Sequence, residues 1–279
     1  MRRSSAFPWT YIESRIAGSR GRYLFDQLKT YVMFIGQPRS GTSLLGSILN
    51  AHRRMCVAQE LNALRYVRRG YNRWQLFWLL MQRDATFAKG GRQWTGYDYV
   101  VPNQWQGKFE DLQVIGDKKA GLSTDQLRRR PKLMDTLQNT VGLPIRIVHV
   151  VRDPFNVITT VHRRRKISME KSAQIYFRRC ETNWQLMQQC GESVMTFELE
   201  ELISQPESHL RNLCSFLGVD AADDYISDCA GILFAKPKQT KTQTEWSTEL
   251  IGRVQREAAK FPFLRNYRFG DERLVAAAA

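Results

Sequence analysis

Short apolar runs rich in branched residues alternate along this chain with amphipathic stretches of helical length. The alternation is typical of βαβ units, in which a parallel sheet is buried between layers of helices. The runs that we predict as strands are Tyr31–Ile35, Leu112–Ile115, Ile145–Val151 and Val194–Phe197. The sequence therefore predicts an α/β fold in which a single domain is built on a parallel sheet flanked by helices.

Helical periodicity predicts helices over residues 124–139, 167–189, 205–217 and 248–260. Ser123 with Gln126 three residues later has the form of a capping box, and it would start the first of these helices. Ser204 with Glu207 has the same form at the start of helix 205–217. Gly218 fits the residue that ends that helix, because glycine adopts the left-handed conformation there at little cost.

Residues 61–110 differ from the rest in their aromatic content, since they hold Trp74, Trp78, Trp94 and Trp105. We interpret them as an insertion between the first two predicted strands, lying over the carboxyl ends of the strands, where ligands bind in α/β sheets. Residues 1–30 are expected to form an N-terminal extension, 31–270 the domain itself and 271–279 a flexible tail.

Charge narrows the choice of partner. The 279 residues are 43% hydrophobic and 25% charged, a composition that excludes wholesale disorder. Lys and Arg number 42 against 27 Asp and Glu, so the net charge is +15. Such a surface attracts nucleic acid, acidic lipid, or a phosphorylated or sulfated small molecule.

Cysteine content and hydropathy indicate the cellular compartment in which the protein is expected. The five cysteines are odd in number and form no CxxC pair, so we expect no disulfide framework and no metal site. The start of the chain has no continuous apolar segment of a secretory signal. The longest apolar run, residues 76–81, is too short to cross a bilayer. We therefore expect a cytoplasmic protein.

The first predicted strand runs into GQPRSGTS, residues 36–43, and then into a helix. A strand, a glycine-bearing turn and a helix start gather backbone N–H groups at the positive end of a helix dipole, which suits a phosphate. The turn is P-loop-like, but Thr42 stands where nucleotide-triphosphate loops carry lysine. Without that lysine, transfer of a γ-phosphate by a phosphotransferase is the weaker alternative.

A second basic cluster follows the strand Ile145–Val151. Arg152 stands at the strand end, and Thr160 and Arg164 share one face of the next helix because they are four residues apart. Two guanidinium groups and a hydroxyl can hold a dianionic phosphate. The alternative is a solvated basic helix face, because Arg163 and Arg165 flank Arg164.

Three segments carry a family resemblance: PRSGTSLL at 38–45, VVRDPFNVITTVHRRRK at 150–166 and TFELEELISQPESHLRNLCSFLGV at 196–219. In this order they resemble the sulfotransferases that use 3′-phosphoadenosine-5′-phosphosulfate, over about residues 31–220. The PRSGT loop is most similar to that of bacterial and tyrosylprotein sulfotransferases. The resemblance implies the sulfotransferase fold and in-line sulfuryl transfer to an acceptor hydroxyl without a metal.

The resemblance also implies where the co-substrate binds. The loop that would hold its 5′-phosphate comprises Pro38, Arg39, Ser40, Gly41, Thr42 and Ser43. Arg152 and Thr160 would hold the 3′-phosphate together with Arg164. Phe197 stands where many members have a tyrosine near the adenine, and it can stack but lacks the hydroxyl.

For catalysis the resemblance implies three residues. Arg39 would stabilise the bridging oxygen and the leaving phosphate, and Lys118 would contact the sulfuryl oxygens. Glu60 would act as general base, because it follows Arg39 at the same interval as the catalytic glutamate of the tyrosylprotein enzymes. His52 and His162 are alternatives for the base.

Residues 236–246 have the basic, hydroxyl-rich character of a segment that closes over the co-substrate, with Thr240, Lys241 and Thr242 as suggested contacts. The aromatic insertion is the expected wall of the acceptor site, for a carbohydrate, lipid, peptide or small metabolite. A basic nucleic-acid-binding module is an alternative, although the basic runs punctuate strand–helix junctions and do not alternate with aromatics on one face. A binder of the co-substrate without activity is the third.

Overall fold

The computed structural model describes residues 6–233 and 239–270. The predicted tail 271–279 and residues 236–238 of the predicted closing segment lie outside the described residues. Within the described part, five parallel strands form one sheet, and we give them here in their spatial order. They are β2 (Met55–Gln59), β5 (Val114–Lys118), β1 (Thr30–Gly36), β6 (Ile145–Val151) and β7 (Val194–Glu198). The predicted α/β fold with a parallel sheet is confirmed.

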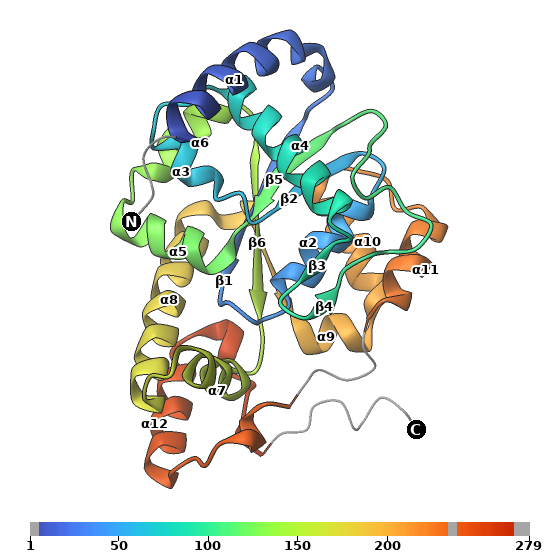
Figure 1. Cartoon of the computed structure of the whole chain (residues 1–279). Coiled ribbons are helices and arrows are strands. Elements are labelled where there is room, and N and C mark those ends of the chain that lie inside the picture. Colours follow the sequence, from blue (N-terminus) through green and yellow to red (C-terminus); the bar gives the residue numbers. More distant parts are fainter. Residues whose placement is uncertain (1–5, 234–238, 271–279) are drawn as a thin grey trace.

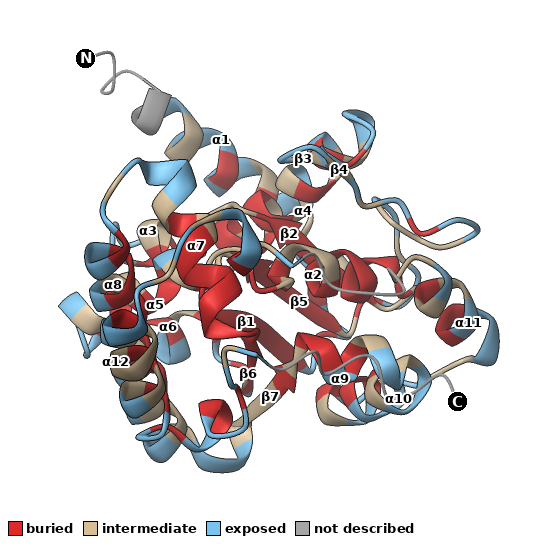
Figure 2. Ribbon diagram, turned by 90° about the horizontal axis from the view of Figure 1, so that it is seen from below, coloured by how far each residue is buried: buried red, intermediate tan, exposed pale blue. Residues whose placement is uncertain are grey.

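Helices cover both faces of this sheet (Figure 1). Tyr31, Met33 and Ile35 of β1 face a core formed with one set of helices. That set is α3 (Ala63–Val67), α4 (Arg73–Lys89), α5 (Ala120–Arg129), α6 (Leu133–Val141) and α8 (Met169–Cys190). Val32 and Phe34 face the other core, formed with α2 (Thr42–Ala51), α10 (Pro206–Leu217) and α11 (Asp223–Gly231). Alternate residues of β1 are thus buried on opposite faces of the sheet. Figure 2 shows that the central strands are largely buried.

The remaining elements lie at the two ends of the sheet or beyond its edge. Before β1 come α1 (Ala6–Arg20) and the 3₁₀ turn η1 (Arg22–Phe25). Beyond the strand ends lie α7 (Pro154–Arg165), α9 (Leu199–Ser204), α12 (Thr248–Ala258), the hairpin β3 (Gln93–Trp94) with β4 (Tyr97–Asp98), and the 3₁₀ turns η2 (Gly191–Ser193), η3 (Lys241–Gln243) and η4 (Pro262–Leu264). No helix of the described residues is long and apolar enough to span a membrane.

Several predicted boundaries are wrong. The helix predicted over 124–139 is two helices, α5 and α6, because Pro131 interrupts it. Ser123 lies inside α5, whose N-cap is Lys119, so it caps nothing. Ser204 belongs to α9, and its hydroxyl donates to the Glu201 carbonyl. The predicted left-handed Gly218 at the end of α10 is confirmed, with φ of 77°.

The strand β2 was missed, and this changes the position of the aromatic insertion. β2 pairs with β5, in a register that places Gln59 opposite Lys118. The strand predicted at Leu112–Ile115 is shifted in the structure to Val114–Lys118. The segment 61–110 therefore follows the edge strand β2 and contains α3, α4 and the hairpin β3–β4.

Candidate active site

The turn between β1 and α2 has the backbone geometry of an anion-binding loop. Gly41 precedes the first residue of α2 with φ of 91°, a left-handed conformation that favours glycine. A side chain there would also collide with Leu199, whose Cδ1 lies 2.7 Å from the position of a Cβ. The loop thus leads directly into the N-terminus of α2, where the first backbone N–H groups lack helical partners.

Buried hydrogen bonds hold this loop in place. The Ser40 hydroxyl is buried and donates to the Gln37 carbonyl at 2.7 Å, and it lies 3.2 Å from the Val150 carbonyl of β6. The Gln37 amide donates to the Tyr176 carbonyl of α8 at 2.8 Å. The Ser40 side chain therefore shapes the loop, and any contact between residue 40 and a phosphate comes from its backbone.

Three guanidinium groups gather at the loop. Arg152, directly after β6, donates from Nη1 to the Arg39 carbonyl at 3.0 Å. Burial lowers the pKa of Arg39, and repulsion from Arg164 and Arg152 lowers it further. Arg164 lies on the exposed end of α7, so solutes can reach this cluster. Like charges held this close favour the binding of an anion between them.

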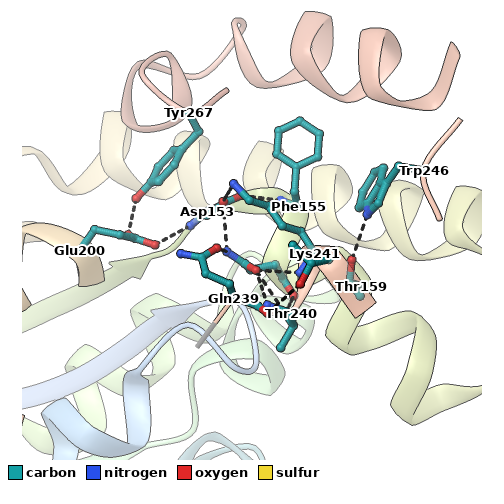
Figure 3. A network of polar contacts seen from close by, with 11 residues as sticks. Asp153, Phe155, Thr159, Glu200, Gln239, Thr240, Lys241, Trp246 and Tyr267 are labelled. Carbon is teal, nitrogen blue, oxygen red and sulfur yellow. Dashed lines mark hydrogen bonds and ion pairs between the residues drawn. The ribbon is translucent and has the colours of Figure 1, made fainter. Parts of the chain in front are cut away.

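Asn156 joins α7 to the segment predicted to close over the site. Figure 3 shows Gln239, Thr240 and Lys241 of that segment beside Asp153. Its side-chain oxygen accepts from the backbone N–H groups of Thr240 and Lys241 at 2.6 and 2.9 Å. Its side-chain nitrogen donates to Asp153 and to Gln239, each at 3.0 Å. One buried amide therefore holds residues 239–241 against the start of α7.

Thr160 lies at this junction. Its hydroxyl donates to the Asn156 carbonyl at 2.8 Å and lies 3.1 Å from the Thr240 hydroxyl. Lys241 is buried, and its ammonium group donates to Asp153 at 3.0 Å. The exposed Thr242 hydroxyl lies 3.4 Å from the Gln239 carbonyl. The structure thus brings Thr240 and Lys241 to α7, and sequence reasoning missed Asn156 and Gln239.

The carboxylate of Glu60 lies between two lysines at the ends of β2 and β5. Lys118 donates to Glu60 Oε1 at 2.6 Å and to the Ser43 hydroxyl at 2.8 Å, and Lys119 pairs with Glu60 Oε2. Lys118 is 1% exposed, so the pair is largely shielded from water. The proposed base, the proposed sulfuryl contact and the phosphate loop therefore form one connected array.

Electrostatics keep Glu60 ionised. Burial raises the pKa of Glu60, but the charges and hydrogen bonds of Lys118 and Lys119 outweigh burial and hold it below the usual range. Burial in turn lowers the pKa of Lys118, an effect opposed by the Glu60 carboxylate. Removal of Glu60 would leave the buried charge of Lys118 without its carboxylate partner.

The backbone around Glu60 is unusual. Glu60 has φ of 64° and Arg39 has φ of 75°, a left-handed conformation that is uncommon for residues other than glycine. The Asp117 carboxylate accepts from the N–H groups of Leu61 and Ala63 at 3.0 and 2.7 Å. Asp117 thereby fixes the turn that carries Glu60, and sequence reasoning missed this role.

The aromatic insertion reaches the phosphate loop. Burial raises the pKa of Tyr99, and the Arg39 charge and the Ser43 and Thr95 hydroxyls oppose that rise, so Tyr99 lies near the phosphate loop. Gln106 ties this segment to α2, because its amide nitrogen donates to the carbonyls of Tyr99 and Ser47 at 2.8 and 3.1 Å. Tyr99 and Gln106 are therefore held against α2, the helix whose first turn carries Ser43.

The structure does not bring three of the candidate residues into this array. Phe197 is 2% exposed and packs in the core against α2 and α10, so its predicted adenine contact finds no support. His52 is buried and bonds to the Asp220 carbonyl at 2.9 Å and to the Arg54 N–H at 3.1 Å. His162 contacts the Ile167 carbonyl at 2.5 Å. Both histidines have structural partners, and this geometry favours Glu60 as the base.

The fold and the arrangement of these charged side chains indicate a type of reaction. A phosphate loop at the carboxyl end of β1, a cation cluster from β6 and α7, and a carboxylate–lysine pair suit the transfer of an anionic group from a nucleotide. In the part of the chain that the structure describes, no group of three His, Cys, Asp or Glu side chains could hold a metal ion.

Comparison with known proteins identifies the family. A model of the sulfotransferase domain matches residues 29–273, and the chain therefore belongs to the sulfotransferase family. No curated protein sequence matches the chain. Membership of the sulfotransferase family favours sulfuryl transfer over the two alternatives, a phosphotransferase and a nucleic-acid-binding module.

Solved structures support the same fold. The sulfotransferase domain of the curacin biosynthetic pathway superposes with a TM-score of 0.56 at 13% identity, covering 84% of this chain and 98% of that domain. The sulfotransferase domain of the Synechococcus PCC 7002 olefin synthase gives 0.50 at 19% identity, covering 82% and 88%. A sulfotransferase from Mycobacterium avium gives 0.50 at 8% identity, covering 88% and 80%.

Proposed function

We propose that the protein transfers a sulfuryl group from 3′-phosphoadenosine-5′-phosphosulfate to an acceptor hydroxyl, within a single catalytic domain of about residues 31–270. The observation that carries the proposal is the position of Arg152, whose guanidinium bonds to the backbone of the phosphate loop at Arg39. This contact joins the two basic clusters, so that one doubly phosphorylated adenosine can reach both.

The donor set fits such a co-substrate. Mutual repulsion among Arg39, Arg152 and Arg164 is relieved when phosphate groups enter between them. The loop backbone and the hydroxyls of Thr42 and Ser43 would hold the 5′-phosphate, and Arg152, Thr160 and Arg164 the 3′-phosphate. When bound, the co-substrate supplies an activated sulfuryl group, which needs no metal to react.

Three residues around the sulfuryl position would have different roles in the reaction. Glu60 would take the proton of the acceptor hydroxyl as that oxygen bonds to sulfur. Lys118 would shift from Glu60 toward the sulfuryl oxygens, which frees the carboxylate for the incoming proton. Arg39 would stabilise the negative charge left on the phosphate oxygen when the sulfur–oxygen bond breaks.

The acceptor would approach along the aromatic insertion. Tyr99 lies near Ser43, and the ring of Tyr97 in β4 lies 6.3 Å from the ring of Tyr99. Aromatic faces of this kind bind sugars, aromatic rings and lipid chains, so the class of acceptor stays open. The cytoplasmic location expected from the cysteines also stays a prediction.

Ligand binding tests the co-substrate. Thermal unfolding of the whole chain is measured with 3′,5′-adenosine bisphosphate, with 5′-AMP, and with ATP plus magnesium, because a bound ligand raises Tm in proportion to the logarithm of its concentration. We expect the bisphosphate to stabilise most, and Arg152→Ala to abolish its advantage over 5′-AMP. Equal stabilisation by 5′-AMP, or greater stabilisation by ATP with magnesium, would refute the proposed site.

A further inference from the structure

The helix α1 presents its apolar side chains to solvent. Six large apolar side chains are exposed among the residues whose exposure the structure describes, and four of them lie within residues 9–23. Trp9 is 75% exposed, Ile12 52%, Ile16 50% and Tyr23 67%. At 100° per residue, the first three lie within about 60° of one another around the helix axis, so they form one stripe.

The inner face of α1 is already used, and its contacts are polar or close-packed. Ser14 is fully buried, and Gly18 lies against the backbone of Trp74 with no room for a side chain. The Gln75 amide donates to the Tyr11 carbonyl at 3.0 Å and to the Ser14 hydroxyl at 3.2 Å. This arrangement is inverted relative to an ordinary surface helix, which buries its apolar face in the protein core.

The charges beside the stripe indicate the occupant. Exposed basic residues outnumber exposed acidic ones between residues 9 and 29. The four basic residues are Arg15, Arg20, Arg22 and Lys29, and the two acidic ones are Glu13 and Asp26. Exposed Trp and Ile side chains beside arginines can enter the headgroup region of a bilayer, where the apolar groups leave water and the arginines meet lipid phosphates. Anionic lipids attract each nearby arginine. A second copy of this chain would instead bring its own arginines against these arginines, and the like charges would repel one another.

A second basic segment lies next to α1. Tyr71 packs edge to face on Tyr11, with ring centroids 5.0 Å apart. Arg65 and Arg69 lie near Tyr71, and desolvation and the charges of Arg65 and Arg68 lower the pKa of Arg69. The positive charge therefore continues from α1 to α3.

We propose that the outer face of α1, defined by Trp9, Ile12, Ile16 and the neighbouring arginines, docks the protein onto an anionic lipid surface. The apolar side chains would enter the headgroup boundary, and the arginines would contact phosphate groups. This inference does not depend on the proposed reaction, because α1 lies at the amino ends of the strands, away from the phosphate loop (Figure 1).

Cosedimentation with vesicles tests the proposal. The whole chain is mixed with vesicles of phosphatidylcholine, with and without phosphatidylserine, at low and at near-physiological salt. We expect binding to the phosphatidylserine vesicles that persists at near-physiological salt. The triple variant Trp9→Ser, Ile12→Ser, Ile16→Ser should lower the partition coefficient at least about tenfold, because it removes the buried apolar area and keeps the charge.

Two comparisons make the result decisive. The matched control Val100→Ser, Leu122→Ser removes two exposed apolar side chains elsewhere and should bind like the original chain. Unchanged binding by the triple variant would show adsorption by net charge alone and overturn the proposal. Absence of vesicle binding, or self-association that the triple variant abolishes, would overturn it as well. The circular dichroism spectrum of each variant establishes that it is folded.

Discussion

Glu60 carries the sharpest prediction at the scale of single residues. We expect Glu60→Gln to lower turnover about a hundredfold or more, because an amide cannot take the acceptor proton. Affinity for 3′,5′-adenosine bisphosphate should stay within a few fold, since Glu60 contacts lysines and not the phosphate-binding groups. Turnover is followed by release of the bisphosphate from the co-substrate once an acceptor is found. Glu110→Gln, a change of an exposed glutamate, is the control, and equal turnover in both variants would exclude Glu60 as the base.

Lys119 affects the pH at which the carboxyl group of Glu60 ionises. Lys119 helps Lys118 to hold the pKa of Glu60 below its usual range, so its removal raises that pKa. A base works only when deprotonated, and the acid limb of kcat/KM should therefore move to higher pH in Lys119→Met. Lys132→Met, at an exposed site, should leave the limb in place. A limb that does not move in Lys119→Met would mean that the titrating group is not Glu60.

Gly46 makes room for the side chain of Lys118. A Cβ at residue 46 would lie 2.8 Å from Cγ of the fully buried Lys118. Gly to Ala within a helix ordinarily stabilises a protein by about 0.5–1 kcal/mol, which is expected for Gly252→Ala in α12. We expect Gly46→Ala to lose that gain and to lower turnover, because Lys118 is displaced. Chemical denaturation of both variants gives the comparison, and equal stabilisation in both would remove this role of Gly46.

At the scale of elements, Asn156 is the joint between α7 and the segment 239–241. Asn156→Ala leaves the buried N–H groups of Thr240 and Lys241 without their acceptor. We expect a loss of about 1–3 kcal/mol in the free energy of unfolding. Affinity for 3′,5′-adenosine bisphosphate should fall roughly tenfold, because the segment no longer braces Thr160. Isothermal titration calorimetry measures the affinity.

Asn139→Ala on the exposed surface of α6 is the control for this element, and it should change stability by less than about 0.5 kcal/mol. A variant at residue 156 that loses stability and keeps full affinity would limit Asn156 to a structural role. Such a result would also separate the closing segment from the 3′-phosphate site.

The sequence was informative where a function resides in consecutive residues. The phosphate loop and the spacing of Arg152 and Thr160 are local patterns, and both lie where the strand–turn–helix pattern predicts. Glu60 and Lys118 meet only because β2 pairs with β5, 58 residues apart. The five residues of β2 lie just beyond the turn at residues 52–54 that follows α2, and the hydrophobic pattern did not predict them as a strand. Asn156 resembles any helical polar residue, because its partners lie 83 to 85 residues further along.

At the scale of the whole molecule, the net charge of +15 opposes folding through self-repulsion, and bound anions relieve it. At equal ionic strength, we expect sulfate to raise Tm more than chloride does, because sulfate mimics a phosphate at the three guanidinium groups. Sulfate also strengthens burial in every protein, so the comparison is made with Arg152→Ala. The advantage of sulfate should shrink in that variant, and an undiminished advantage would show that sulfate acts only through the solvent.

The helix α1 lies at the amino ends of the strands, and the phosphate loop lies at their carboxyl ends. The seven residues of β1 separate α1 from the phosphate loop by roughly 20 Å. A molecule held by lipid along α1 turns its reactive pole toward the water, beyond the reach of groups embedded in the same leaflet. Substrates delivered in solution would then be favoured over membrane-resident ones, and tethering the protein through its α1 pole in a biosensor would leave the reactive pole open.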